Sequence, residues 1–238
     1  MISVCMATYN GAAFVEEQLR SILAQLGEKD EIIVSDDGST DATLAIIQAV
    51  GDPRIRLLPP HEPLGSTRNF YYALDAAKGD IIFLSDQDDV WLPGRVERCL
   101  EELRKADLVV TDCQVVDESL QILYPSLFKL YGLREGLWHN LLRCGFYGSL
   151  MAMHRSVVER AKPWPKNDEL IKHDWWLGIV AEKTGTVRFI SDTQYVLYRR
   201  HDKTETIVSR NILHRSRRSL TTRIMARMAM AKQLIMQS

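Results

Sequence analysis

Three aspartates lie within four positions of the chain, directly after an apolar run. The segment reads SDQDDVW over 85–91, and IIFL precedes it. Carboxylates this close repel one another unless a cation lies between them. Mg²⁺ and Mn²⁺ prefer oxygen ligands and commonly take one or two carboxylates together with substrate phosphates. The cluster therefore indicates a divalent cation held by Asp86 and Asp88, although a solvated acidic turn before a helix would give the same pattern.

The residues around this cluster alternate between strand and helix patterns. Apolar runs typical of strands cover 2–7, 31–35, 55–58, 80–85 and 106–113. Helical spacing of apolar residues lies between these runs, over 14–25, 44–50, 66–77 (with Ser66 as the cap) and 93–103. Repeated units of this kind predict an α/β fold with a mostly parallel central sheet and helices on both faces.

A parallel sheet brings the carboxyl ends of its strands to one edge, where ligands bind. That rule places three polar segments together, which are ATYN at 7–10, SDDGS at 35–39 and SDQDD at 85–89. The second half of the chain is less regular. Its patterns predict a strand over 145–153, helices over 155–161 and 173–185, and short strands over 187–190 and 195–199.

Several motifs, in this order and spacing, closely resemble glycosyltransferase family 2, whose members have the nucleotide-sugar-dependent GT-A fold. The likeness is carried by SVCMATYNGAAFVEEQLRSILAQ, EIIVSDDGSTDAT, GSTRNFYYALDAAKGDIIFLSDQDDVWLPGRVE, HDWWL and YVLYRRH. It extends from about Ile2 to about His201. Within the family, DQDDVW together with HDWW looks most like the bacterial rhamnosyltransferase-type members.

The resemblance implies a donor site built at the first two strand ends. Ala7, Thr8 and Tyr9 would line the nucleotide pocket, and Asp37 would accept a hydrogen bond from the ring N–H of the base. Arg68 would approach the base or the diphosphate. Elementary chemistry agrees with these roles, because a uracil or thymine ring offers one N–H donor to a carboxylate and a flat face to a tyrosine.

The resemblance also implies the catalytic groups. Asp88 would bind the metal directly, Asp86 would contact the ribose or the ion, and Asp174 would be the general base. His201 resembles the histidine that closes the family's pattern and is a candidate to hold the metal or the diphosphate. Here the sequence departs, because HDKTET follows where the family usually has Gly and Asn. A cation that stabilises a departing diphosphate, with one base and no covalent nucleophile, implies direct displacement with inversion.

Four of the later candidates also have a plain structural interpretation. Asp174 suits a helix N-terminus, where a carboxylate is favourable. Trp175 and Trp176 are expected to divide between the core and the sugar site. Met151 is expected either beside the donor sugar or in the core.

The overall composition argues against nucleic-acid binding and membrane-spanning classes. The net charge is −1, and no apolar run approaches the length of about 20 residues that a membrane helix needs. Four cysteines without metal-ligand spacing indicate free thiols in a reducing cytosol. No acidic residue follows position 206, whereas several arginines do, so we divide the chain into a GT-A domain over 1–206 and a basic helical tail over 207–238.

The expected function is the transfer of a sugar to a bacterial surface polysaccharide or its lipid-linked precursor. The resemblance points to L-rhamnose from dTDP-rhamnose, with another UDP- or dTDP-hexose donor as the alternative. A non-catalytic sugar-nucleotide binding module is an alternative of another class. A phosphotransfer protein, which SDDGST alone would suggest, leaves SDQDD and HDWW without a role. We expect a cytoplasmic protein whose basic tail either is a solvated helix or contacts the anionic inner face of the cytoplasmic membrane.

Overall fold

The structure is a computed structural model that describes residues 1–201 and 219–236. The expected division between 206 and 207 lies outside these residues. The described part of the tail is one helix, α9 (Leu220–Met236). No helix of the described residues is long and apolar enough to cross a lipid bilayer.

The first half of the chain builds a parallel sheet from alternating strands and helices. Its elements are β1 (Ile2–Thr8), α1 (Val15–Leu23), β2 (Glu31–Asp36), α2 (Thr43–Val50), β3 (Ile55–Leu57), α3 (Ser66–Ala76) and β4 (Ile81–Asp86). Hydrogen bonds join them in the order β3-β2-β1-β4, and every pair is parallel. The predicted units are confirmed, except that Gly65 and not Ser66 precedes the first helical residue of α3.

The second half extends the same sheet with mixed strand directions. Its elements are β5 (Val90–Trp91), α4 (Arg95–Leu103), β6 (Leu108–Val116), β7 (Ile122–Tyr124), α5 (Leu127–Tyr131), α6 (Leu137–Leu142), η1 (Gly148–Leu150), β8 (Met151–His154), α7 (Arg155–Arg160), α8 (His173–Thr184) and β9 (Val187–Arg199). β8 lies between β4 and β6 and is antiparallel to both. β9 is parallel to β6 and antiparallel to β5. It is one strand where two short strands were expected.

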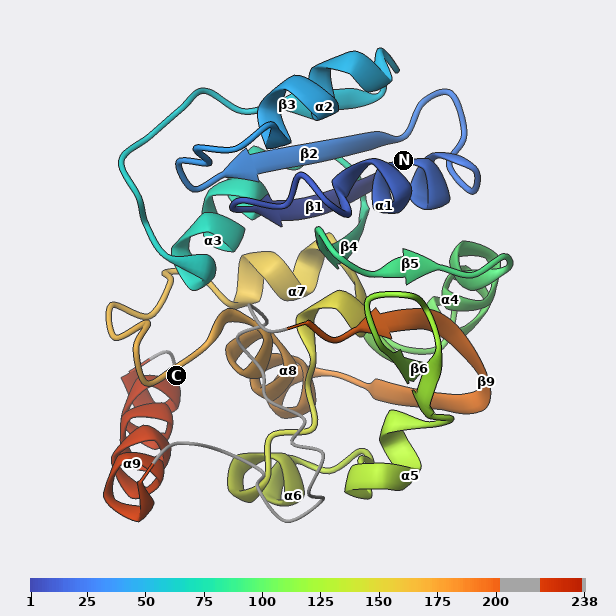
Figure 1. Cartoon of the computed structure of the whole chain (residues 1–238). Coiled ribbons are helices and arrows are strands. Elements are labelled where there is room, and N and C mark those ends of the chain that lie inside the picture. Colours follow the sequence, from blue (N-terminus) through green and yellow to red (C-terminus); the bar gives the residue numbers. More distant parts are fainter. Residues whose placement is uncertain (202–218, 237–238) are drawn as a thin grey trace.

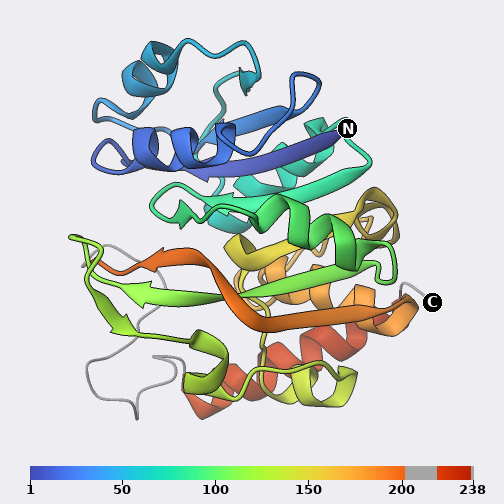
Figure 2. The ribbon, with the colours of Figure 1, turned by 90° about the vertical axis from the view of Figure 1, so that its right-hand side faces the viewer.

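Helices cover both faces of this sheet, as Figures 1 and 2 show. α1 and α2 pack together on one face, and α4 lies over β6 and β8 on the same side. α3 lies over β1 and β2 on the opposite face, where it packs against α8. The strands can therefore be apolar on both sides, and Val4, Phe83 and Val110 are fully buried. The predicted α/β fold class, with a mostly parallel sheet and helices on both faces, is confirmed. Three of the four cysteines are buried free thiols.

Candidate active site

The carboxyl ends of β1, β2 and β4 meet at one edge of the sheet. The strand register pairs Ala7 with both Ser35 and Asp86, and it pairs Thr8 with Asp36. The three polar segments that the sequence predicted to converge therefore lie side by side. Any group bound at this edge meets side chains from all three.

Asp36 fixes the turn that follows β2. Its Oδ1 accepts hydrogen bonds from the N–H groups of Gly38 at 3.1 Å and Ser39 at 2.7 Å. Its Oδ2 accepts from the hydroxyls of Thr8 at 2.7 Å and Ser39 at 2.6 Å. Thr8 is buried, so its hydroxyl joins the end of β1 to this turn. Asp36 thus holds this edge of the sheet in shape. Its two oxygens already accept four hydrogen bonds, which is their full capacity.

Asp37, the next residue, holds the loop that leads into α3. Its Oδ1 accepts from the N–H of Leu64 at 2.6 Å, and its Oδ2 accepts from the N–H of Gly65 at 3.0 Å. Gly65 has a φ of 76°, a left-handed conformation that glycine adopts without a steric penalty. Each carboxylate oxygen has two acceptor directions. The contacts of Asp37 therefore remain compatible with a hydrogen bond from a base.

Gln87 joins the turn after β1 to the acidic loop after β4. Its Oε1 accepts from the N–H of Tyr9 at 2.9 Å, and its Nε2 donates to the carbonyl of Tyr9 at 2.9 Å. A Cβ on Gly11 would lie 2.1 Å from Gln87 Oε1, so a larger residue at Gly11 would displace this side chain. The side chain of Tyr9 is exposed, which leaves its ring open to stack on a base. Sequence reasoning had assigned no role to Gln87.

Asp88 meets His201 across the acidic loop. His201 Nε2 lies 2.7 Å from Asp88 Oδ2, although 113 positions separate the two residues. The imidazole also stacks on Phe14, with ring centroids 5.0 Å apart. Asp86 is half-buried at the end of β4, and its carbonyl accepts a hydrogen bond from Gln18. The structure thus places side by side two of the side chains that the sequence names as candidate metal ligands, Asp88 and His201.

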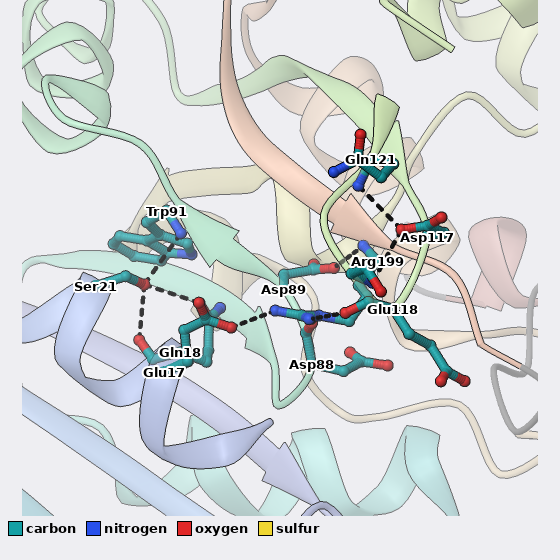
Figure 3. Close-up of polar contacts among 11 residues, drawn as sticks. Glu17, Gln18, Ser21, Asp88, Asp89, Trp91, Asp117, Glu118, Gln121 and Arg199 are labelled. Atoms are coloured by element: carbon teal, nitrogen blue, oxygen red, sulfur yellow. Dashed lines mark hydrogen bonds and ion pairs between the residues drawn. The ribbon is translucent and has the colours of Figure 1, made fainter. Parts of the chain in front are cut away.

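Arg199 fixes this loop from the end of β9, as Figure 3 shows. Its Nε donates to the carbonyl of Asp88 at 2.7 Å, and Nη1 donates to the carbonyl of Glu118 at 2.7 Å. Its Nη2 pairs with the carboxylate of Glu17 on α1, and its backbone N–H donates to Asp89 at 3.0 Å. Sequence reasoning missed this residue, for which the only signal was its place in the YRRH segment.

Asp89 in the loop and Arg95 on α4 are both buried and lie within electrostatic range of each other. Burial raises the pKa of Asp89 to about 7, and the adjacent carboxylate of Asp88 adds to the rise. Burial also lowers the pKa of Arg95 to about 10. The guanidinium of Arg95 lies 4.1 Å from the centroid of the Trp91 ring and donates to the carbonyl of Ser149. Arg95 therefore joins the start of α4 to η1.

Asp174 lies in the first turn of α8, on the other side of η1. Its Oδ1 accepts from the N–H of Trp175 at 2.7 Å, which agrees with a carboxylate at a helix N-terminus. A Cβ on Gly148 would lie 3.7 Å from Asp174 Cβ, so Asp174 packs against η1, and η1 in turn packs against β4. Burial, and then the charge of Asp174, raise the pKa of Tyr71 on α3. The catalytic role of Asp174 stays a prediction.

Both tryptophans of α8 lie in the core. Trp175 donates its indole N–H to the carbonyl of Asn140 at 2.9 Å, and Trp176 donates to the carbonyl of Ala161 at 2.9 Å. Both indoles are buried and find their hydrogen-bond partners inside the protein, and the expected place of one of them at the sugar site stays a prediction. Met151 is fully buried in β8, so its structural interpretation holds.

Arg68 pairs with a carboxylate of this chain. Its Nε lies 2.9 Å from Asp168 Oδ2, and its Nη2 lies 3.0 Å from Asp168 Oδ1, which is a two-pronged contact. A base or diphosphate would have to compete with Asp168 for this guanidinium. The predicted donor role of Arg68 therefore stays a prediction.

The geometry of this edge agrees with a match of residues 3–161 to a known family. The family model described as "Glycosyl transferase family 2" matches residues 3–161. The chain belongs to glycosyl transferase family 2. The resemblance stated from the motifs is thereby confirmed.

Relatives of this family 2 member differ in how much of their length it spans. It is 27% identical to the dTDP-rhamnosyl transferase RfbG of Shigella flexneri over 215 residues, which are 84% of this chain and 73% of RfbG. The crystal structure of S. aureus TarS 1-349 in complex with UDP-GlcNAc matches with a TM-score of 0.65 and 17% identity, over 85% of this chain and 59% of TarS.

The mannosyltransferase PcManGT from Pyrobaculum calidifontis, in complex with GDP-Man and Mn²⁺, matches with a TM-score of 0.60 and 21% identity. The match covers 82% of this chain and 55% of PcManGT. This chain thus spans less than two thirds of either structural neighbour. Both likenesses show a shared fold, which confirms the expected GT-A architecture.

Proposed function

We propose that this protein is an inverting, metal-dependent glycosyltransferase that uses a nucleoside diphosphate sugar as its donor. The observation that carries the proposal is the 2.7 Å contact of His201 with Asp88. This contact lies at the edge of the sheet where β1 and β2 also end. Family 2 membership supplies the reaction class. The contact supplies a site at which that reaction's leaving group can be held.

The residues at this edge fit Mg²⁺ or Mn²⁺. Asp88 would hold the ion with an oxygen, His201 would offer a nitrogen, and Asp86 lies at the end of β4, two positions before Asp88. No cluster of three metal-ligating side chains exists in the part of the chain that the structure describes. That agrees with an ion that takes one or two side chains and completes its shell with substrate phosphates. When bound, the ion would neutralise charge on the departing diphosphate.

The chain's own residues would bind the base and move the proton. The exposed ring of Tyr9 would stack on the base, and Asp37 would accept the hydrogen bond from its ring N–H. Asp174 would accept the proton of the acceptor hydroxyl as that oxygen attacks the anomeric carbon from the face opposite the diphosphate. A positioned base of this kind contributes roughly 10²–10⁴-fold to the rate.

The proposed donor is dTDP-L-rhamnose. Its support is the similarity to RfbG, a dTDP-rhamnosyl transferase, over 84% of this chain. Another UDP- or dTDP-hexose is the alternative, because TarS, with the same fold, is in complex with UDP-GlcNAc. The proposed acceptor is a saccharide or a lipid-linked saccharide precursor, in keeping with relatives such as the succinoglycan biosynthesis protein ExoO.

We further propose that this cytoplasmic enzyme contacts a membrane surface through α6 and α9, which lie side by side (Figures 1 and 2). Ala226 and Met230 face the protein, whereas the large apolar side chains that remain exposed on the two helices are Trp138, Leu142, Ile224, Met225, Met228, Ile235 and Met236. α9 also carries three basic residues and no acidic one. Apolar and basic side chains on one surface are typical of an interfacial helix.

Two variants and a binding screen test the enzyme proposal. Thermal unfolding with dTDP-rhamnose, UDP-hexoses and GDP-mannose, each with Mn²⁺, should show which donor raises the melting temperature. Asp88→Ala should abolish the metal-dependent part of that rise. Asp174→Asn should keep the rise but reduce turnover by roughly 10²-fold or more. Wild-type turnover in Asp174→Asn would remove Asp174 from the role of base.

A further inference from the structure

Arg200 is a buried arginine without a hydrogen-bond partner for its guanidinium. The residue is 9% exposed, and Nε, Nη1 and Nη2 all lack a partner among residues 1–201 and 219–236. No ion pair joins it to any carboxylate of the described residues. Its neighbour Arg199 is buried too, yet it satisfies all three of its guanidinium nitrogens. The two adjacent arginines thus differ in their hydrogen-bond partners among the described residues. Every guanidinium nitrogen of Arg199 has one, and none of Arg200 does.

An unpaired buried charge is costly to the folded protein. A compensating contact comes from the ring of Tyr198, whose centroid lies 5.0 Å from the Arg200 guanidinium carbon. A cation over a tyrosine ring recovers only about 0.5–2 kcal/mol. A site that keeps such a charge unpaired is suited to an anion that arrives from outside the chain.

Arg200 lies at the same edge of the sheet as the acidic loop. The backbone N–H of Arg200 donates to the carbonyl of Val116 at 2.8 Å. This bond places Arg200 at the carboxyl end of β6, on the edge of the sheet where the acidic loop lies. Burial raises the pKa of Tyr198, Arg200 opposes the rise, and Asp86 adds to it, so Arg200 and Asp86 both lie within electrostatic range of this ring. The following residue, His201, touches Asp88. Arg200 therefore lies between two residues that contact the acidic loop, Arg199 and His201.

We propose that Arg200 binds the phosphoryl oxygens of the donor's diphosphate. This inference rests on the proposed function and adds a residue to it. As the bond between the anomeric carbon and the diphosphate oxygen breaks, its electron pair stays on that oxygen. The acceptor oxygen forms the new bond, and its proton passes to Asp174. A fixed guanidinium beside the leaving group stabilises the charge that develops there. Arg68 is less suited to bind the diphosphate, because its guanidinium already pairs with Asp168.

Calorimetric titration tests the inference. The proteins are wild type, Arg200→Gln and Arg200→Lys, and the ligands are dTDP, UDP and GDP, each with MnCl₂. Arg200→Gln should weaken the nucleotide that wild type binds by about 10- to 100-fold, since a charged hydrogen bond to phosphate is lost. Arg200→Lys should recover part of the loss, because it restores the charge without the planar fork. Arg188→Gln, an exposed arginine on the same strand, is the matched control and should bind as wild type.

Thermal unfolding without ligand separates binding from structure. The melting temperature of Arg200→Gln should equal or exceed that of wild type, because the guanidinium it removes has no partner. A lower melting temperature with unchanged nucleotide affinity would overturn the inference and assign Arg200 to the fold. If wild type itself binds none of the three nucleotides, the proposed function fails instead, so the two failures are distinguishable.

Discussion

Gln87 makes both of its side-chain hydrogen bonds to the backbone of one residue, Tyr9. Gln87→Ala removes both, and each such bond contributes about 0.5–1.5 kcal/mol. We expect the affinity for the donor nucleotide, measured by titration with Mn²⁺, to fall about tenfold. Gln48→Ala, on the exposed side of α2, is the matched control. Unchanged affinity in Gln87→Ala would mean that the Tyr9 turn keeps its shape without this contact.

The sequence predicts which residues are polar at the strand ends but not which partners they take. Asp36, Asp37 and Asp88 could be placed because each follows a recognisable apolar strand. The pairing of Arg68 with Asp168 could not be predicted, nor could the contacts of Arg199 with the acidic loop. Such contacts join segments about a hundred positions apart, and nothing local in the chain encodes them.

Among the elements, the start of β2 is tied to three neighbours through Glu31. Its carboxylate accepts from the hydroxyl of Ser3 on β1 at 2.6 Å and from the N–H of Lys78 ahead of β4 at 2.9 Å. Arg56 on β3 completes the set at 3.2 Å. Burial opposes the ionisation of Glu31, but these donors together lower its pKa below the ordinary value. Glu31 therefore holds the four parallel strands together at their amino ends, opposite the acidic loop.

Glu31→Gln is expected to lower the free energy of unfolding at pH 7 by about 1–2 kcal/mol. A carboxyl with a lowered pKa stabilises the fold above its unfolded-state pKa of about 4.3, and that contribution is lost as the pH falls through the folded-state pKa. The difference between wild type and variant in urea unfolding should therefore shrink from pH 7 to pH 3. Glu16→Gln, which breaks an exposed pair with Arg20, should change little at either pH. A pH-independent difference would contradict the role of the charge.

The first four strands were predictable because each is a short apolar run and each connecting helix has one apolar stripe. The direction of β8 was not, because an isolated run such as MAMH carries no sign of its orientation. The polar segment SDTQ over 191–194 suggested a break between two strands. In the structure Gln194 pairs with Asp112 and donates to its carboxylate at 3.2 Å, and the irregular register there absorbs the extra residues. Pairing of this kind is decided by the neighbouring strand.

Taken as a whole, the molecule exposes its large apolar side chains unevenly, and α6 and α9 carry most of them. Co-sedimentation with phosphatidylglycerol-containing vesicles tests the proposed membrane contact. Arg223→Gln with Lys232→Gln should weaken binding by about 30-fold, since each basic residue near an anionic surface contributes about 1 kcal/mol. Trp138→Ser should also weaken it, whereas Leu123→Ser, exposed on β7, should not. Equal binding of wild type to pure phosphatidylcholine would refute the electrostatic part.

The contacts of Arg199 have a consequence for how the protein comes into being. Arg199 lies 111 positions after Asp88 and 182 after Glu17, and it joins both. A chain growing on the ribosome therefore exposes its acidic loop long before the residue that orders it has been translated. The loop can therefore take the shape seen in the structure only after β9 has been translated and has paired with β6.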